Sequence, residues 1–215
     1  MNEKILEATI AYVKNELKGA EAGHDWFHIY RVWNNAKKIS EKEEVNVLIV
    51  ELGALLHDIA DSKFHAGNEK IGPEKARTFL ESLFIDKAII SHVVQIIENI
   101  SFKGGNFNQS FFSPELAVVQ DADRLDAIGA IGTARAFHYG GFKNRVIYDP
   151  TIPPNLLMDK EQYKNSDAPT INHFYEKLLL LKDKMNTNTG RILAESRHTF
   201  MQNFLDQFYQ EWNAD

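Results

Sequence analysis

A histidine and an aspartate, His57 and Asp58, stand next to each other at the end of the densest apolar stretch, which runs from Val45 to Ile59. Burying an imidazole and a carboxylate is costly unless a partner compensates both groups. A divalent metal ion is such a partner, because imidazole nitrogens and carboxylate oxygens both bind ions of this kind. The pair therefore indicates a metal site where this segment ends.

Two further side chains can complete a ligand set. His28 lies beside an apolar stripe, one turn before Val32, so we expect it to face inward. Asp123 belongs to a polar island, QDADRLDAIGA, in apolar surroundings. Each residue taken alone is better explained by ordinary hydrogen bonds. Together with His57 and Asp58, they favour a metal site with two histidines and two aspartates.

The composition narrows the chemistry further. The sequence contains no cysteine, which excludes disulfides, zinc-thiolate sites, iron-sulfur clusters and thiol catalysis. It also lacks a phosphate-binding glycine-rich loop with Lys and Ser or Thr, an H-E-x-x-H motif and a G-x-S-x-G motif. Any metal must therefore be held by histidines and carboxylates.

The elements that must position these residues are predicted to be helical. Apolar spacing and capping residues favour helices over 2–18, 25–39, 45–59, 69–84, 86–100, a stretch starting at Ser113 that carries Asp123, 171–185 and 190–212. Residues 140–169 are rich in Gly, Pro, Asn and Asp, which favours a functional loop or lid. Gly129 and Gly132 are interpreted as a bend or close helix packing, because no strand precedes them.

Length and charge limit the partners. The 215 residues, 44% apolar and 25% charged, fit one large globular domain or at most two small ones. A net charge of -6 argues against long nucleic acids, whose binding needs clustered cations. The N-terminus does not resemble a signal peptide, and no run approaches the roughly 18–20 apolar residues that span a membrane. We therefore expect a cytoplasmic protein without a membrane partner, and a homo-oligomer is compatible with the sequence.

The sequence resembles the HD-domain superfamily of metal-dependent phosphohydrolases in blocks that cover most of the chain. These blocks read DWFHIYRV, LLHDIADSKF, IIENISFKG, DADRLDAIGA and INHFYEKL, and they are similar to those of small bacterial HD hydrolases. The resemblance implies an all-α, single-domain helical bundle of the HD type over residues 1–215. Its HD core spans about residues 20–130, with extra C-terminal helices over about 167–212.

The same resemblance implies a metal ligand set of His28, His57, Asp58 and Asp123. The last ligand of the family lies in an Ala-Asp-Arg or similar triplet, which selects Asp123 over its neighbours Asp121 and Asp126. His24 competes with His28 for the first position. It lacks the Arg-Val context that follows His28.

Other residues are expected to handle protons and phosphate. Asp61 stands three residues after Asp58, a spacing at which some HD nucleotidases carry a catalytic carboxylate, so we predict a general acid or base there. A solvated turn residue is the alternative. The cations Arg31, Lys63 and Arg124 lie within a few residues of the ligands and are predicted to bind phosphate. Lys63 could instead be a surface residue, and Arg124 could neutralise a neighbouring aspartate.

Four polar residues of the C-terminal helices, His173, Lys177, Lys182 and His198, could reach over the pocket, and their roles stay open. His92 is interpreted as a core histidine or as a residue that supports the ligands, so one metal ion is expected. Mn2+ is the preferred ion, and Mg2+, Co2+, Ni2+ or Fe2+ are the alternatives.

The resemblance implies hydrolysis of a small nucleotide, with nucleoside triphosphate pyrophosphohydrolase as the leading activity. The alternatives are a nucleoside 5'-monophosphate phosphatase, a cyclic-nucleotide phosphodiesterase, and a non-catalytic metal-stabilised sensor or scaffold.

Overall fold

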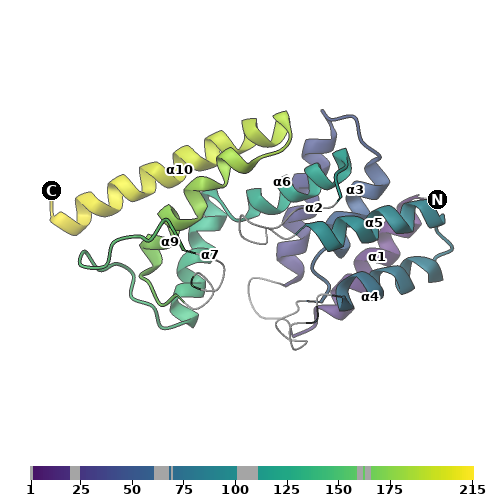
Figure 1. The fold of residues 1–215 in the computed structure, drawn as a ribbon, viewed down its shortest axis with the longest axis horizontal. Coiled ribbons are helices and arrows are strands. Elements are labelled where there is room, and N and C mark those ends of the chain that lie inside the picture. The colour runs from purple at the N-terminus through teal and green to yellow at the C-terminus, as the bar shows by residue number, and fades with distance from the viewer. Residues whose placement is uncertain are drawn as a thin grey trace. The chain divides into compact units, whose positions relative to one another are not determined.

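The computed structural model describes residues 2–19, 25–60, 68, 70–100, 111–158, 162 and 166–215 (Figure 1). Every regular element in these ranges is helical, as predicted. The described residues form two compact units, one ending at Asp123 and the other beginning at Arg124. No helix of the described ranges is both long enough and apolar enough to cross a membrane.

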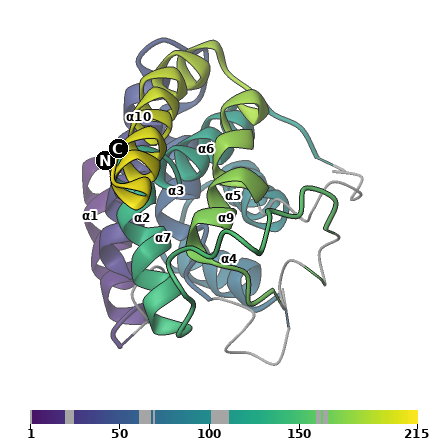
Figure 2. The ribbon, with the colours of Figure 1, turned by 90° about the vertical axis from the view of Figure 1, so that its left-hand side faces the viewer.

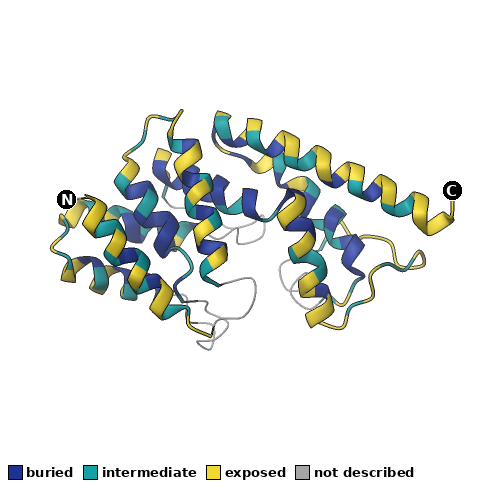
Figure 3. Cartoon of the chain, turned by 180° about the vertical axis from the view of Figure 1, so that it is seen from behind, coloured by how far each residue is buried: buried dark blue, intermediate teal, exposed yellow. Residues whose placement is uncertain are grey.

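The first unit is built around helix α3, whose residues from Leu52 to Leu56 are all buried (Figure 3). Helices α1, α2 and α5 pack against α3, and α4 packs against α5. Gly53 allows this close packing, because a Cβ atom there would lie 3.2 Å from a side-chain carbon of Ile96. The helices of this unit are α1 (Asn2–Glu16), α2 (Trp26–Ser40), α3 (Val47–Leu56), α4 (Ile71–Ser82), α5 (Lys87–Asn99) and most of α6 (Pro114–Asp126).

Polar residues fix where several of these helices begin. Asp86 accepts a hydrogen bond from the backbone of Ala88 at 2.8 Å, and Ser113 accepts one from Leu116 at 3.0 Å. Both were predicted as helix starts from the sequence, and both predictions are confirmed. Such caps satisfy backbone N–H groups that have no partner within the helix.

The second unit contains α7 (Gly129–Phe142), α9 (Thr170–Glu176), the 3-10 turns η2 (Leu178–Leu180) and η3 (Lys182–Lys184), and α10 (Asn188–Asn213). Helix α10 packs against α7 and η3, and Figure 2 shows its turns from one end. The side chain of Phe174 is fully buried, and its ring is stacked on Phe204 with the centroids 5.7 Å apart. Aromatic residues therefore form much of this core.

The single helix predicted over 171–185 is wrong. The α-helix ends at Glu176, where Lys177 leaves helical geometry with φ -144° and ψ -56°. Two short 3-10 turns follow, a geometry of about three residues per turn. This period brings Leu178 and Leu181, three residues apart, to the same buried side, which explains why the apolar run does not continue as an α-helix.

Helix α7 was not predicted as a separate element, but the interpretation of its glycines is confirmed. Gly129 opens the helix with a positive φ of 74°, a conformation that favours glycine. A Cβ on Gly132 would lie 2.2 Å from the carbonyl oxygen of Ala127. The chain therefore bends and packs too closely here for a larger side chain.

Candidate metal centre

His28 lies in the first turn of α2 and is 4% exposed. The carboxylate of Asp25 caps this helix by accepting a hydrogen bond from the backbone N–H of His28 at 3.0 Å. The next buried residues on α2, Ile29 and Val32, hold the same face against the core. The sequence-based expectation that His28 faces inward is confirmed.

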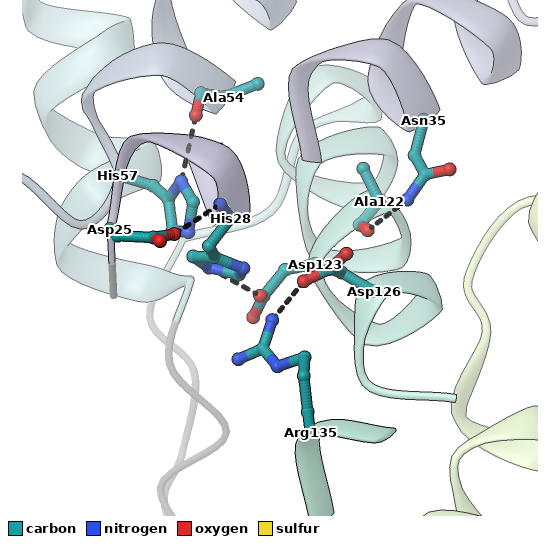
Figure 4. A network of polar contacts seen from close by, with 9 residues as sticks. All are labelled: Asp25, His28, Asn35, Ala54, His57, Ala122, Asp123, Asp126 and Arg135. Carbon is teal, nitrogen blue, oxygen red and sulfur yellow. Dashed lines mark hydrogen bonds and ion pairs between the residues drawn. The ribbon is translucent and has the colours of Figure 1, made fainter. Parts of the chain in front are cut away.

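His57 follows the last residue of α3, and its ring has a defined hydrogen-bond partner. The Nδ1 atom lies 2.9 Å from the carbonyl oxygen of Ala54 (Figure 4). A carbonyl oxygen can only accept, so this contact places the proton of the neutral ring on Nδ1. The Nε2 atom then carries the lone pair, which is the form that binds a metal ion.

The first three predicted ligands converge. His28, His57 and Asp58 each offer one ligand atom, and these atoms all lie within 4.8 Å of one another. The two imidazole rings meet edge to face with centroids 5.4 Å apart. Two atoms that each bind one ion at about 2.0–2.4 Å lie at most about 4–5 Å apart. The donor types and the spacing therefore fit one divalent ion.

Asp123 lies on α6 beside this group. Its Oδ1 atom is 3.6 Å from Nε2 of His28, and its side chain is 41% exposed (Figure 4). The amide of Asn35 on α2 donates to the carbonyl of Ala122 at 3.2 Å, which ties the two helices together next to Asp123. A hydrogen bond of 2.7 Å from Trp33 to Glu51 likewise ties α2 to α3.

The two rival aspartates of α6 have different surroundings. Asp121 is fully buried, and Asp126 is 2% exposed and forms an ion pair with Arg135. Asp123 differs from both in that its carboxylate is half exposed and beside an imidazole. Asp123 thus lies beside His28 but is not one of the three residues whose ligand atoms converge within 4.8 Å.

The predicted phosphate-binding and proton-handling residues are placed only in part. Asp61, Lys63 and the rival histidine His24 lie outside the described residues. Arg31 stands one turn after His28 on α2 and is half-buried. Arg124 donates to the carbonyl oxygen of Lys184 at 2.6 Å, so at least part of its guanidinium holds η3.

His92 and Lys182 each have partners that are not among the candidate ligands. The Nε2 atom of His92 lies 2.8 Å from the Ser113 hydroxyl and 3.4 Å from the Glu115 carboxylate, at the start of α6. Glu115 in turn accepts from the backbone of Asn46 at 2.9 Å. Lys182 pairs with Glu195 at 3.3 Å. His92 thus fastens the helix that carries Asp123, in keeping with a supporting role.

Sequence reasoning missed two groups that orient the histidines. Asp25 had a detectable signal, because an Asp directly before an apolar helical pattern is a typical N-cap. The carbonyl of Ala54 had none, because every residue carries the same backbone oxygen. Its role depends on how the helix ends at His57.

Comparisons with known proteins show the family to which this chain belongs. The family model of the HD domain matches residues 26–128. The Bacillus subtilis protein YpgQ is 36% identical over 216 residues, covering 97% of this chain and 94% of YpgQ. The solved structure of an HD-superfamily hydrolase from Bacillus thuringiensis is 45% identical, covers 100% of both chains and superposes with a TM-score of 0.80.

YpgQ has also been solved in complex with ADP. That structure is 37% identical in sequence, covers 98% of this chain and 97% of its own, and has a TM-score of 0.78. The shared fold, the His and Asp cluster and the extent of these matches lead to one conclusion. This chain belongs to the HD superfamily of hydrolases, as a small bacterial HD protein like YpgQ, and that membership implies a divalent metal ion.

Proposed function

We propose that this protein is a metal-dependent phosphohydrolase that cleaves small nucleotides, with nucleoside triphosphates as substrates and pyrophosphate as a product. The observation that carries the proposal is the convergence of ligand atoms from His28, His57 and Asp58 within 4.8 Å. The nucleotide part is supported by the complex of the similar protein YpgQ with ADP. ADP contains two linked phosphates, which favours a substrate with a phosphate chain.

The proposed ligands of the ion are His28, His57, Asp58 and Asp123. When bound, a divalent ion polarises a phosphoryl oxygen and lowers the pKa of water towards neutrality. Mn2+ is the proposed ion, because a mixed set of imidazoles and carboxylates suits it well, and other divalent ions would also be accepted. The protein keeps the set in place through the Ala54 carbonyl and the cap of α2.

The remaining roles concern charge and protons. We propose that Arg31, Lys63 and Arg124 bind the negatively charged phosphates. The two arginines would donate paired N–H groups of the guanidinium, and the lysine would contribute the charge of its ammonium group. We assign Asp61 to the transfer of a proton between water and the leaving group. Arg31 is the first of these to test, because it stands one turn from His28 on the same helix.

A panel of substrates with Mn2+ tests the reaction. It contains ribo- and deoxynucleoside mono- and triphosphates and cyclic nucleotides, and the assay separates orthophosphate from pyrophosphate. Pyrophosphate release from triphosphates is expected. Release of orthophosphate from monophosphates would instead identify a nucleoside monophosphate phosphatase. Opening of cyclic nucleotides would identify a phosphodiesterase. A metal-loaded protein that hydrolyses none of them would instead support a sensor or scaffold.

A further inference from the structure

Helix α10 carries an arginine on its core-facing side. The buried residues of this helix are Gly190, Ala194, Met201 and Leu205. Arg197 stands one turn after Ala194 and one turn before Met201, so it lies on the same face of the helix. A guanidinium on such a face is costly to bury unless hydrogen-bond acceptors compensate it.

The acceptor that Arg197 uses belongs to the main chain of α6. Its guanidinium donates to the carbonyl oxygen of Leu125, in the last turn of that helix. The same carbonyl accepts from the backbone N–H of Ile128, but at 3.4 Å, which is long for a hydrogen bond of this kind. A charged donor that is partly withdrawn from water makes a strong bond. Arg197 is therefore the stronger of these two donors to Leu125.

A glycine lets Arg197 come this close to α6. A Cβ atom on Gly129 would lie 2.9 Å from Cβ and 3.0 Å from Cγ of Arg197. The stem of the arginine therefore packs directly on the residue that opens α7, where a larger side chain would displace it. Leu125, Gly129 and Arg197 all belong to the second unit.

The turn of α6 that Arg197 holds also carries Asp123. The last four C=O groups of an α-helix have no N–H partner within the helix, so helix ends fray unless other donors hold them. Leu125 lies two residues after Asp123 on the same continuous helix. The position of the Asp123 carboxylate, 3.6 Å from Nε2 of His28, therefore depends on the order of this turn.

We propose that Arg197 is a positioning residue for the metal centre. By donating to the Leu125 carbonyl, it keeps the last turn of α6 ordered and holds the Asp123 carboxylate beside His28. This inference rests on the proposed role of Asp123 as a metal ligand. Arg197 acts through the main chain and not as a ligand, because a guanidinium has no lone pair to offer an ion. Groups that support metal ligands in this way contribute strongly to metal affinity.

Calorimetric titration of the metal-free full chain with Mn2+ tests this role. Arg197→Gln should weaken Mn2+ binding about tenfold, as the loss of a group that supports a metal ligand does. The matched control is Arg191→Gln in the same helix, because the guanidinium of Arg191 also donates to main-chain carbonyls, those of Met185 and Asn186, each at 3.2 Å. These carbonyls are not on α6, so the affinity of this variant should stay within about twofold of the unmodified chain.

A double substitution separates positioning from a general effect on the fold. In an Asp123→Asn background, Arg197→Gln should change Mn2+ affinity by less than about twofold, because the side chain through which it acts is already gone. Losses that add up in the double variant would overturn the inference. Urea denaturation of the metal-free proteins measures stability separately. A variant that is less stable but binds Mn2+ normally would show a purely structural role and would likewise overturn it.

A second variant covers the case in which Arg197→Gln does not fold. Arg197→Met keeps an apolar stem that can pack on Gly129 but cannot donate to the Leu125 carbonyl. We expect the same loss of Mn2+ affinity from it, and an unchanged affinity would contradict the positioning role.

Asp123→Asn alone separates this inference from the proposed ligand set. If it leaves Mn2+ affinity unchanged, Asp123 is not a ligand, and the role of Arg197 is overturned with it. If Asp123→Asn weakens binding but the folded Arg197 variants do not, the ligand set stands and only the role of Arg197 is overturned. Weaker binding in both, without further loss in the double variant, supports the inference. No nucleotide is present in these titrations, so the result does not depend on which reaction the protein catalyses.

Discussion

At the level of single residues, the candidate metal centre depends on the state of one imidazole. The contact between Nδ1 of His57 and the Ala54 carbonyl selects the tautomer whose Nε2 can bind an ion. The buried ring of His28 is positioned by its helix cap. Both histidines are thus oriented before any ligand arrives, which lowers the entropic cost of binding.

Replacing His57 should remove the metal without unfolding the chain. We expect His57→Ala to lower metal content, measured by mass spectrometry, and to lower phosphohydrolase activity by more than about a hundredfold. The control is His138→Ala, which removes an exposed histidine from α7. A folded His57→Ala protein with full metal content and activity would contradict the proposed ligand set.

Substitutions of Asp123 and Asp126 on α6 should have different effects, one on metal binding and the other on stability. Asp123→Asn should lower metal content and leave the melting temperature of the metal-free protein nearly unchanged, because its carboxylate is half exposed. Asp126→Asn should destabilise the fold by about 2–3 kcal/mol, because it breaks the ion pair between the buried carboxylate and the partly buried Arg135. Denaturant titration combined with metal analysis measures both effects. Metal loss in Asp126→Asn but not in Asp123→Asn would reverse the assignment.

At the level of the helices, close packing around α7 depends on glycine. A Cβ on Gly132 would meet the Ala127 backbone at 2.2 Å, whereas one on Gly141, in the same helix, would meet nothing within 4 Å. The two positions form a matched pair, because the substitution and the helix are the same and only the space differs.

Gly132→Ala should therefore lower the free energy of unfolding by about 2 kcal/mol or more, since the backbone must shift. Gly141→Ala should leave it unchanged or raise it by up to about 1 kcal/mol through helix propensity. Urea denaturation of the two variants checks the difference. Equal stabilities would show that the bend at α7 relaxes freely.

The sequence predicted the helices of the first unit and α10 well, because their apolar spacing and caps are local. It also singled out His57 and Asp58, because two adjacent polar groups at the end of an apolar helix demand a partner, and the structure brings both close to His28. That these residues bind a metal ion stays a prediction. The break at Lys177 was missed, since it depends on which leucines reach the core. Backbone acceptors such as the Ala54 carbonyl carry no residue-specific signal.

At the level of the whole molecule, stability should depend on pH through His173. The pKa of its ring lies near 6.5 in the unfolded chain and at about 3 in the fold. Below pH 6.5 the unfolded state takes up a proton that the folded state refuses, so stability falls as the pH falls towards 3. Above pH 6.5 both states are neutral, and this residue adds no dependence.

Replacing His173 should remove this loss of stability at low pH. Between pH 7 and pH 5 the unmodified chain should lose about 2 kcal/mol more stability than His173→Asn. Urea titrations with a chelator present exclude effects of metal binding, and His138→Asn, at an exposed position, should behave like the unmodified chain. Parallel pH profiles for the unmodified chain and His173→Asn would show that the ring is accessible to protons in the fold.

The acceptor that orients His57 is a main-chain oxygen, and this has an evolutionary consequence. Genetic drift at position 54 can exchange the side chain, but no point mutation deletes the carbonyl. Selection on the imidazole's orientation therefore acts through the helical path of α3, and position 54 is constrained only by the room around it. A comparison of conserved side chains alone would therefore not reveal that the Ala54 carbonyl orients His57.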